Sequence, residues 1–451
     1  MNAVDLVLRG GLVVTPAGVR EADLAVAEEK IVAVEETFSG SFVHEIDARG
    51  LHLFPGLIDA HVHFNEPGRT DWEGIETGSR ALAAGGGTVF FDMPLNAHPP
   101  TIDGESFDLK LAAAARNSLT DFALWGGLVP GNLDRLEELA ERGVVGFKAF
   151  MSDSGIDDFS CVDDGTLRQG MKRAAGLNLP VAVHAESDVM TRRLARERIA
   201  QGRTSVRDYL ESRPVAAELD AIRRATDLAS ETGCQLHVVH VSSGAGVQMI
   251  SEARARGVDV SAETCPHYLA LSAADMEQIG ATAKCAPPLR EPAEREALWQ
   301  RVLAGEVATI GSDHSPSPPG MKTSRDFFQV WGGISSVQHT LSILLEEAHH
   351  HRGIPLEALA KMLSTGVAAR FSLPREKGSI GVGSDADLAL VDLGGTFEVI
   401  AEELFYRHRH SPYVGRKLRG RVVRTLLRGR TIFQDGKRVA TPSGRLVKPL
   451  R

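Results

Sequence analysis

The sequence is poor in cysteine and contains no long hydrophobic run. Its 451 residues include 4 cysteines, and no two of them have the C-x-x-C spacing of a zinc knuckle. Neither a disulfide framework nor a cysteine metal site is therefore expected, and a reducing, cytoplasmic setting fits best. Residues 1–11 alternate like a strand, with no apolar core behind a basic start. We expect no signal peptide and no membrane-spanning helix.

A surplus of basic charge is also lacking. Lys and Arg number 50 against 59 Asp and Glu, which gives a formal net charge of −9. This balance argues against a nucleic-acid or membrane-surface binder, and the basic cluster at 416–421 is interpreted as solvated surface. With 43% hydrophobic and 24% charged residues the composition is that of an ordinary globular protein, longer than one typical domain.

The pattern of the two chain ends differs from that of the middle. Short β-type runs with Gly and Pro turns fill residues 5–47 and return after Gly378, so 1–53 and 372–451 are predicted to form one small β-sandwich domain. Between 54 and 371, apolar strand-like runs alternate with segments of helical period. This predicts an α/β fold, a (β/α)₈ TIM-like barrel, with a doubly wound sheet as the alternative.

His61 and His63 lie at the end of the first predicted strand of this middle region. Side chains at i and i+2 of a strand point the same way, so both imidazoles can reach one metal ion. Two histidines alone do not make a site. Further polar residues end later predicted strands, namely Lys148, His184, His240 and Asp313.

These strand ends would meet at one mouth of a barrel, where such folds place catalysis. A single histidine is more often hydrogen-bonded or exposed than a ligand, and a lone Asp is usually a turn former. The coincidence on successive strands favours a metal site. His237, three residues from His240, should face elsewhere, and the run 349–351 is interpreted as a solvent-facing helix end.

Lys148 interrupts an apolar strand, where burial of an ammonium group is costly. Its amine could pair with an unseen carboxylate or reach water along its own stem. It could also have reacted with CO₂, and the carbamate would supply two oxygens to bridge two metal ions. The charges of one Asp, one carbamate and one hydroxide would offset most of two divalent cations.

The chain resembles the cyclic amidohydrolases of the urease-related superfamily, which include dihydroorotases, dihydropyrimidinases (hydantoinases) and allantoinases. The resemblance rests on residues 56–63, 146–150, 183–186, 240–243 and 311–314. It implies two divalent metal ions per subunit, of Zn or of Mn, Co or Fe. His61 and His63 would hold one ion and His184 and His240 the other, with Lys148 bridging as N6-carboxylysine. Asp313 would be a ligand and the proton shuttle for a metal-bridging hydroxide.

Residues of the predicted pocket distinguish members of this family. Asn65 and Leu95 stand where dihydroorotases carry the Arg and Asn that clamp a carboxylate, and residues 150–155 lack the Tyr of dihydropyrimidinases. Residues 61–70, 92–101, 284–290 and 312–316 are most similar to allantoinases. The resemblance implies hydrolysis of allantoin to allantoate by a homotetramer. The alternatives are a hydantoinase or dihydropyrimidinase, and a non-catalytic relative that kept the fold.

Polar residues near these motifs are candidates to contact the substrate, although each could equally be a turn residue. Cys285 and His267 are interpreted as structural or as lying behind the ligands. The candidate substrate contacts are Asn65, Asn96, Ser152, Ser154 and Ser315.

Overall fold

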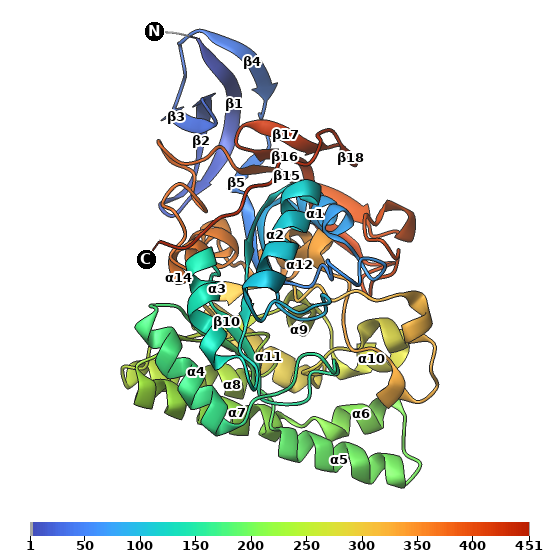
Figure 1. The fold of residues 1–451 in the computed structure, drawn as a ribbon. Coiled ribbons are helices and arrows are strands. Elements are labelled where there is room, and N and C mark those ends of the chain that lie inside the picture. The colour runs from blue at the N-terminus through green and yellow to red at the C-terminus, as the bar shows by residue number, and fades with distance from the viewer. Residues whose placement is uncertain (1–2, 451) are drawn as a thin grey trace.

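The computed structural model of the chain describes residues 3–450 as a mixed α/β protein (Figure 1). Strands from both chain ends lie together at one extremity of the molecule, and the helices surround parallel strands in the remainder. Within the described chain, no helix combines the length and apolar character that crossing a membrane requires.

The two chain ends form one nine-stranded sheet, in the order β18-β17-β16-β15-β5-β1-β2-β3, with β4 paired to β1. Strand β5 joins the halves, because Leu53 lies opposite Leu390 of β15 in antiparallel register. Inward-facing aliphatic residues such as Leu8, Leu24 and Leu388 form its core. The strands are β1 (Val4–Thr15), β2 (Gly18–Ala27), β3 (Lys30–Glu35), β4 (Phe42–Asp47), β5 (His52–Pro55), β15 (Leu388–Glu398), β16 (Lys417–Leu427), β17 (Arg430–Gln434) and β18 (Lys437–Arg438).

All strands of the middle region pair in parallel, in a three-stranded and a six-stranded sheet. Their residues are buried on both faces, which is typical of parallel sheets covered by helices. An isolated parallel bridge between Val62 and His314 links the first strand to the segment after the last. The strands are β6 (Leu57–Val62), β7 (Gly87–Asp92), β8 (Asp121–Leu124), β9 (Gly126–Gly127), β10 (Phe147–Phe150), β11 (Val181–His184), β12 (Leu236–Val238), β13 (Val260–Thr264) and β14 (Thr309–Ile310).

Local sequence explains where the helices begin and which face they bury. The Asp103 side chain accepts a hydrogen bond from the Ser106 amide at the start of α2, in a capping box. Helix α7 buries Ala221, Ala225 and Leu228 at helical spacing. The helices are α1 (Ile75–Ala84), α2 (Gly104–Asn117), α3 (Leu136–Arg142), α4 (Asp164–Gly176), α5 (Asp188–Ala200), α6 (Val206–Ser212), α7 (Val215–Thr232), α8 (Gly244–Ala255), α9 (Pro266–Ala270), α10 (Ala273–Ile279), α11 (Pro292–Leu303), α12 (Thr340–Leu344), α13 (Leu356–Ala360) and α14 (Gly366–Arg370).

Two expectations about exposed polar runs need correction. His351 is exposed, but His349 and His350 are half-buried, and their rings lie 2.9 Å and 3.2 Å from the carbonyl oxygens of Ile354 and Leu393. The basic cluster at 416–421 is not simply solvated. Arg419 donates to Glu346, which lies in the helical segment Leu345–His350 that also contains the first two of these histidines. Part of the basic cluster therefore forms an ion pair with an acidic residue from a distant part of the chain, and is not only solvated.

Candidate metal centre

Three of the predicted ligands, His61, His63 and Asp313, lie together just beyond the carboxyl ends of β6 and β14. The Nε2 atoms of His61 and His63 lie 3.3 Å and 3.4 Å from Oδ1 of Asp313, and one donor atom from each lies within 4.8 Å of the others. Burial alone would raise the pKa of Asp313, but the neighbouring imidazoles lower it below its ordinary value. The carboxylate therefore stays ionised beside two ring nitrogens, which suits a cation.

The other two histidines face each other beside this group. Nδ1 of His184, at the end of β11, lies 3.0 Å from Nε2 of His240, two residues beyond β12. The ring of His240 also lies 5.3 Å from that of His61, measured between centroids. His240 and Asp313 have φ angles of 40° and 46°, a left-handed conformation that non-glycine residues rarely adopt and that recurs at functional sites.

Lys148 lies in β10 with none of its side chain exposed. Its Nζ has no hydrogen-bond partner in the part of the chain that the structure describes, and it lies 5.1 Å from the centroid of the Phe150 ring. Burial lowers the pKa of this amine to about 7, against weaker opposing effects of Asp313 and Glu263. A substantial fraction of the group is then neutral near pH 7, so its nitrogen lone pair is available for reaction.

Two buried carboxylates orient the histidine rings, and sequence reasoning assigned a role to neither. Glu263 lies 2.8 Å from Nδ1 of His61 and 3.4 Å from Nε2 of His237. Burial acts to raise the pKa of Glu263, but the hydrogen bonds from these rings lower it to about 2. This contact leaves Nε2 of His61 directed at Asp313, as in metal sites whose ligands are held by a second set of groups. His237 contacts Glu263 and Ser261, so it shares Glu263 with His61 but does not join the histidines that line the cavity.

Glu186 holds the other histidine pair in the same way. Its Oε2 lies 2.9 Å from Nε2 of His184 and accepts a hydrogen bond of 2.5 Å from the guanidinium group of Arg213. The Phe150 ring stacks on the His184 ring at a centroid separation of 4.6 Å. The Nδ1 atom of His184 is thereby fixed towards His240. Glu186 is two residues from His184 in sequence, and that spacing was the only available signal for it.

A cavity of about 430 Å³ opens onto this cluster. It is lined by the four histidines and Asp313, and also by three of the predicted substrate contacts, Asn96, Ser154 and Ser315. Asn65 and Ser152 are buried outside the lining, and Asn65 donates to the Pro316 carbonyl oxygen. The Ser154 hydroxyl donates to the Phe159 carbonyl oxygen at 2.6 Å, as a loop-forming residue would. A cavity of about 630 Å³ beside α1 contains none of the six predicted ligands.

One side of the cavity is lined by a loop that carries none of the predicted ligands. Residues 327–333, here called the wall segment, line it through Phe328 to Gly333. The buried Lys284 donates to the carbonyl oxygens of Phe327 and Val330, each at 2.6 Å. Lys322 donates to those of Trp331 and Gly333, each at 2.8 Å. Neither ammonium group forms an ion pair with an acidic side chain of the described residues, and no sequence motif indicated this arrangement.

Residues 52–432 match the model of the amidohydrolase family. The chain is 59% identical to an allantoinase of Rubrobacter xylanophilus over 451 residues, covering 100% of this chain and 99% of that protein. It is 52% identical to an allantoinase of Deinococcus radiodurans, covering 99% of each.

Solved structures of related enzymes superpose closely on the chain. An L-hydantoinase (dihydropyrimidinase) from Arthrobacter aurescens matches with a TM-score of 0.96 and 33% identity, over 99% of this chain and 100% of the other. A dihydropyrimidinase from Brevibacillus agri matches with a TM-score of 0.92 and 31% identity, over 98% of each.

Proposed function

The chain belongs to the amidohydrolase family, and we propose that it hydrolyses the ring amide of allantoin to give allantoate. The relatives named allantoinase match essentially its whole length. The observation that carries the chemistry is the clustering of four histidines and Asp313. Burial lowers the pKa of His61, His184 and His240, and the buried amine of Lys148 lies close enough to lower it further. That amine has no hydrogen-bond partner among residues 3–450. A hydantoinase or dihydropyrimidinase activity is the second candidate, because the superposed solved structures bear those names.

The proposed scaffold is a (β/α)₈ barrel formed by residues 54–371. The parallel pairing within β6–β8 and within β9–β14, together with the bridge between Val62 and His314, supports closure of these strands. Residues 1–53 and 372–451 would form the small β-sandwich domain. The nine-stranded sheet drawn from both ends supports this division, although Val447 also donates to the Phe122 carbonyl oxygen of the barrel region.

The residues present fit two divalent metal ions. His61, His63 and Asp313 would hold one ion, His184 and His240 the other, and Lys148 would bridge them as N6-carboxylysine. The donor set of imidazoles and carboxylates suits Zn, and equally Mn, Co or Fe. Bound ions would lower the pKa of water and polarise the amide carbonyl group.

The proposed carbamate is supported by the state of the Lys148 amine. Its nitrogen lone pair forms a bond to the carbon of CO₂, and one proton leaves to solvent. The neutral amine is favoured by burial and has no competing hydrogen-bond partner among residues 3–450. The product carries a negative charge, which the metal ions would stabilise in a buried site.

The proposed proton carrier is Asp313. Its carboxylate lies at the cavity surface beside His61 and His63 and is ionised at neutral pH. It can therefore accept a proton from the attacking water and deliver it to the departing ring nitrogen. Asn96, Ser154 and Ser315 would contact the substrate from the cavity wall. Asn65 and Ser152 would act from behind it, by shaping the loops that carry these contacts.

Turnover of four substrates by one preparation tests this function. Purified enzyme, with its metal content measured, is assayed on allantoin, hydantoin, dihydrouracil and dihydroorotate. We expect the highest kcat/KM on allantoin. Turnover of hydantoin or dihydrouracil without turnover of allantoin would establish the second candidate. Fewer than about one ion per chain, unresponsive to added metal and bicarbonate, would revive a non-catalytic role.

Two further predictions concern the whole protein. The homotetramer implied by the family resemblance stays a prediction, which sedimentation analysis tests. A cytoplasmic location also stays a prediction. It is supported by the four cysteines, all of which are free thiols in the structure.

A further inference from the structure

A second group of potential metal ligands lies beside the first and shares Asp313 with it. Cys265 follows β13 directly and His267 lies in α9, and one donor atom from each falls within 4.8 Å of the other and of an Asp313 oxygen. Cys265 and His267 are completely buried. Neither was needed to explain the centre described above.

His267 gives an independent reason to expect a ligand there. Neither of its ring nitrogens has a hydrogen-bond partner in the described part of the chain. A neutral imidazole has one donor and one acceptor nitrogen, and burying a polar group without a partner is unfavourable. A bound cation would satisfy the acceptor nitrogen.

The type of donor decides which cation would bind. The proposed centre for allantoin hydrolysis offers imidazole nitrogens and carboxylate or carbamate oxygens, whereas this group adds a thiol. Thiolates select soft divalent ions such as Zn²⁺ and Cd²⁺ over harder ones. We propose that Cys265, His267 and Asp313 form an additional site for a thiophilic divalent cation, and that its occupation inhibits the enzyme.

The inhibition follows from the shared carboxylate, and this part rests on the proposed function. On binding, the thiol of Cys265 loses a proton to solvent and its sulfur bonds to the cation. An oxygen of Asp313 becomes a ligand of the same ion. Asp313 can then no longer accept the proton of the attacking water, so hydrolysis stops although the catalytic ions remain.

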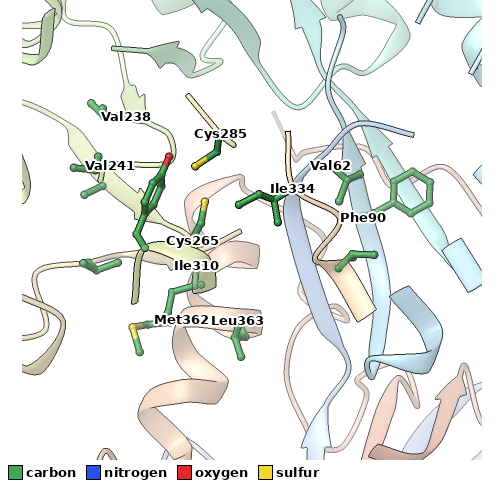
Figure 2. Close-up of a cluster of buried hydrophobic side chains, with 14 of the residues drawn as sticks. Val62, Phe90, Val238, Val241, Cys265, Cys285, Ile310, Ile334, Met362 and Leu363 are labelled. Atoms are coloured by element: carbon green, nitrogen blue, oxygen red, sulfur yellow. The ribbon is translucent and has the colours of Figure 1, made fainter. Parts of the chain in front are cut away.

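The cavity provides the route of entry. Asp313 lines it, and so does a second thiol, Cys285. Figure 2 shows Cys265 and Cys285 in the same buried cluster, beside Ile334 and above Ile310. Cys285 lines the cavity whereas Cys265 does not, so an ion that enters the cavity can meet Cys285 first. For this reason the experiment must separate the two thiols.

Titration of the metal-loaded enzyme with Cd²⁺ alone tests the site. The ultraviolet charge-transfer band of a Cd–thiolate bond reports sulfur ligation, and the catalytic centre contains no sulfur ligand. We expect the band to saturate near one added ion per chain, with allantoin hydrolysis falling in parallel. Cys265→Ser should lose the band and need at least about tenfold more Cd²⁺ for half inhibition, which corresponds to about 1.4 kcal/mol of binding free energy.

Three further variants control this result. Cys161→Ser changes a thiol outside the group and should behave as the unmodified enzyme. His267→Asn should keep the band but need more Cd²⁺ to saturate it, and it replaces Cys265→Ser if that variant fails to fold. Cys285→Ser should keep the band at unchanged stoichiometry.

The proposal is overturned if Cys265→Ser retains the band, or if Cys285→Ser alone abolishes it. It is also overturned if Cd²⁺ inhibits Cys265→Ser and the unmodified enzyme equally. The band and its stoichiometry do not depend on turnover. A chain that binds Cd²⁺ through Cys265 but does not hydrolyse allantoin would therefore refute the proposed function and leave the metal site standing.

Discussion

The two sides of the cavity are constructed in different ways. On the metal side, side chains at strand ends face the cavity, and buried acids hold their rings, as Glu263 holds His61 and Glu186 holds His184. On the side of the wall segment, carbonyl oxygens of a loop accept hydrogen bonds from Lys284 and Lys322. The metal side thus depends on side chains that can bind a cation, whereas the position of the wall segment depends on hydrogen bonds to its backbone.

We expect the two sides to contribute differently to metal binding and to the choice of substrate. Changes on the metal side should reduce metal binding and the rate for every substrate together. Changes to the lysines of the wall segment should alter the shape of the cavity, and therefore the choice between substrates, while much of the rate survives.

Replacing Lys148 by Ala should have the greatest effect. The variant loses the group proposed to bridge the two ions, so metal content should fall and kcat/KM for allantoin should drop by about a thousandfold or more. Added acetate, which can occupy the vacated space and supply a carboxylate, should restore part of the activity. Lys172→Ala, at an exposed lysine of α4, is the control. Unchanged metal content and activity in Lys148→Ala would refute the bridging role.

Replacing Glu186 by Gln should have a smaller effect on the same side. The amide can still accept a hydrogen bond but lacks the charge that pairs with Arg213 and supports His184. Metal affinity or activity should fall about 10–100-fold. Metal titration followed by calorimetry separates loss of affinity from loss of rate. Glu211→Gln removes the charge of an exposed ion pair and should bind metal normally. Equal affinities in the two variants would contradict the positioning role.

The sequence indicated the candidate ligands of the metal side, but not the buried carboxylates that orient their rings. Residues at i and i+2, or at the ends of successive strands, have a spacing that is visible before folding, so His61, His63 and Asp313 could be grouped in advance. The match to the amidohydrolase family confirms the family resemblance on which their proposed roles rest. Glu263 could not be found in this way, because it is 202 positions from His61 and its partner depends on how the strands are arranged.

The wall segment could not be predicted at all. When a lysine donates to backbone carbonyl oxygens, the sequence of the accepting residues gives no signal of it, because every residue has a carbonyl group. For Asn65 and Ser152 the sequence suggested a contact that the fold does not provide. Both were expected to contact the substrate because they lie beside a motif, but they are buried outside the cavity lining. Sequence spacing thus identified candidate ligands, whereas only the fold showed which polar residues reach the cavity.

Replacing Lys284 by Met should alter selectivity more than rate. Two buried carbonyl oxygens of the wall segment lose their donor, at a cost of about 1–3 kcal/mol each, and the segment should move. We expect the ratio of kcat/KM for allantoin to that for hydantoin to change by about tenfold, with metal content unchanged. Lys361→Met, at an exposed lysine, should leave the ratio as it was. A proportional loss on both substrates would remove the distinction between the two sides.

The smallest expected effect is a pH dependence of stability that comes from Lys322. Burial lowers the pKa of its amine from the ordinary value of 10.5 to about 7 in the folded chain. Between these values the unfolded chain binds more protons than the folded one at this position, so the contribution of Lys322 to stability rises with pH from about 7 to about 10. Below pH 7 the Lys322 amine is charged in both the folded and the unfolded chain, and above pH 10.5 it is neutral in both, so its contribution to stability is constant in these ranges.

Lys322→Met removes this dependence of stability on pH. Melting curves at fixed metal loading should show the Tm of the unmodified enzyme gaining about 1–3 °C on the variant between pH 7 and 10. Parallel curves would mean that Lys322 keeps an ordinary pKa, and the wall segment would then be held by an ammonium group that remains charged throughout this range.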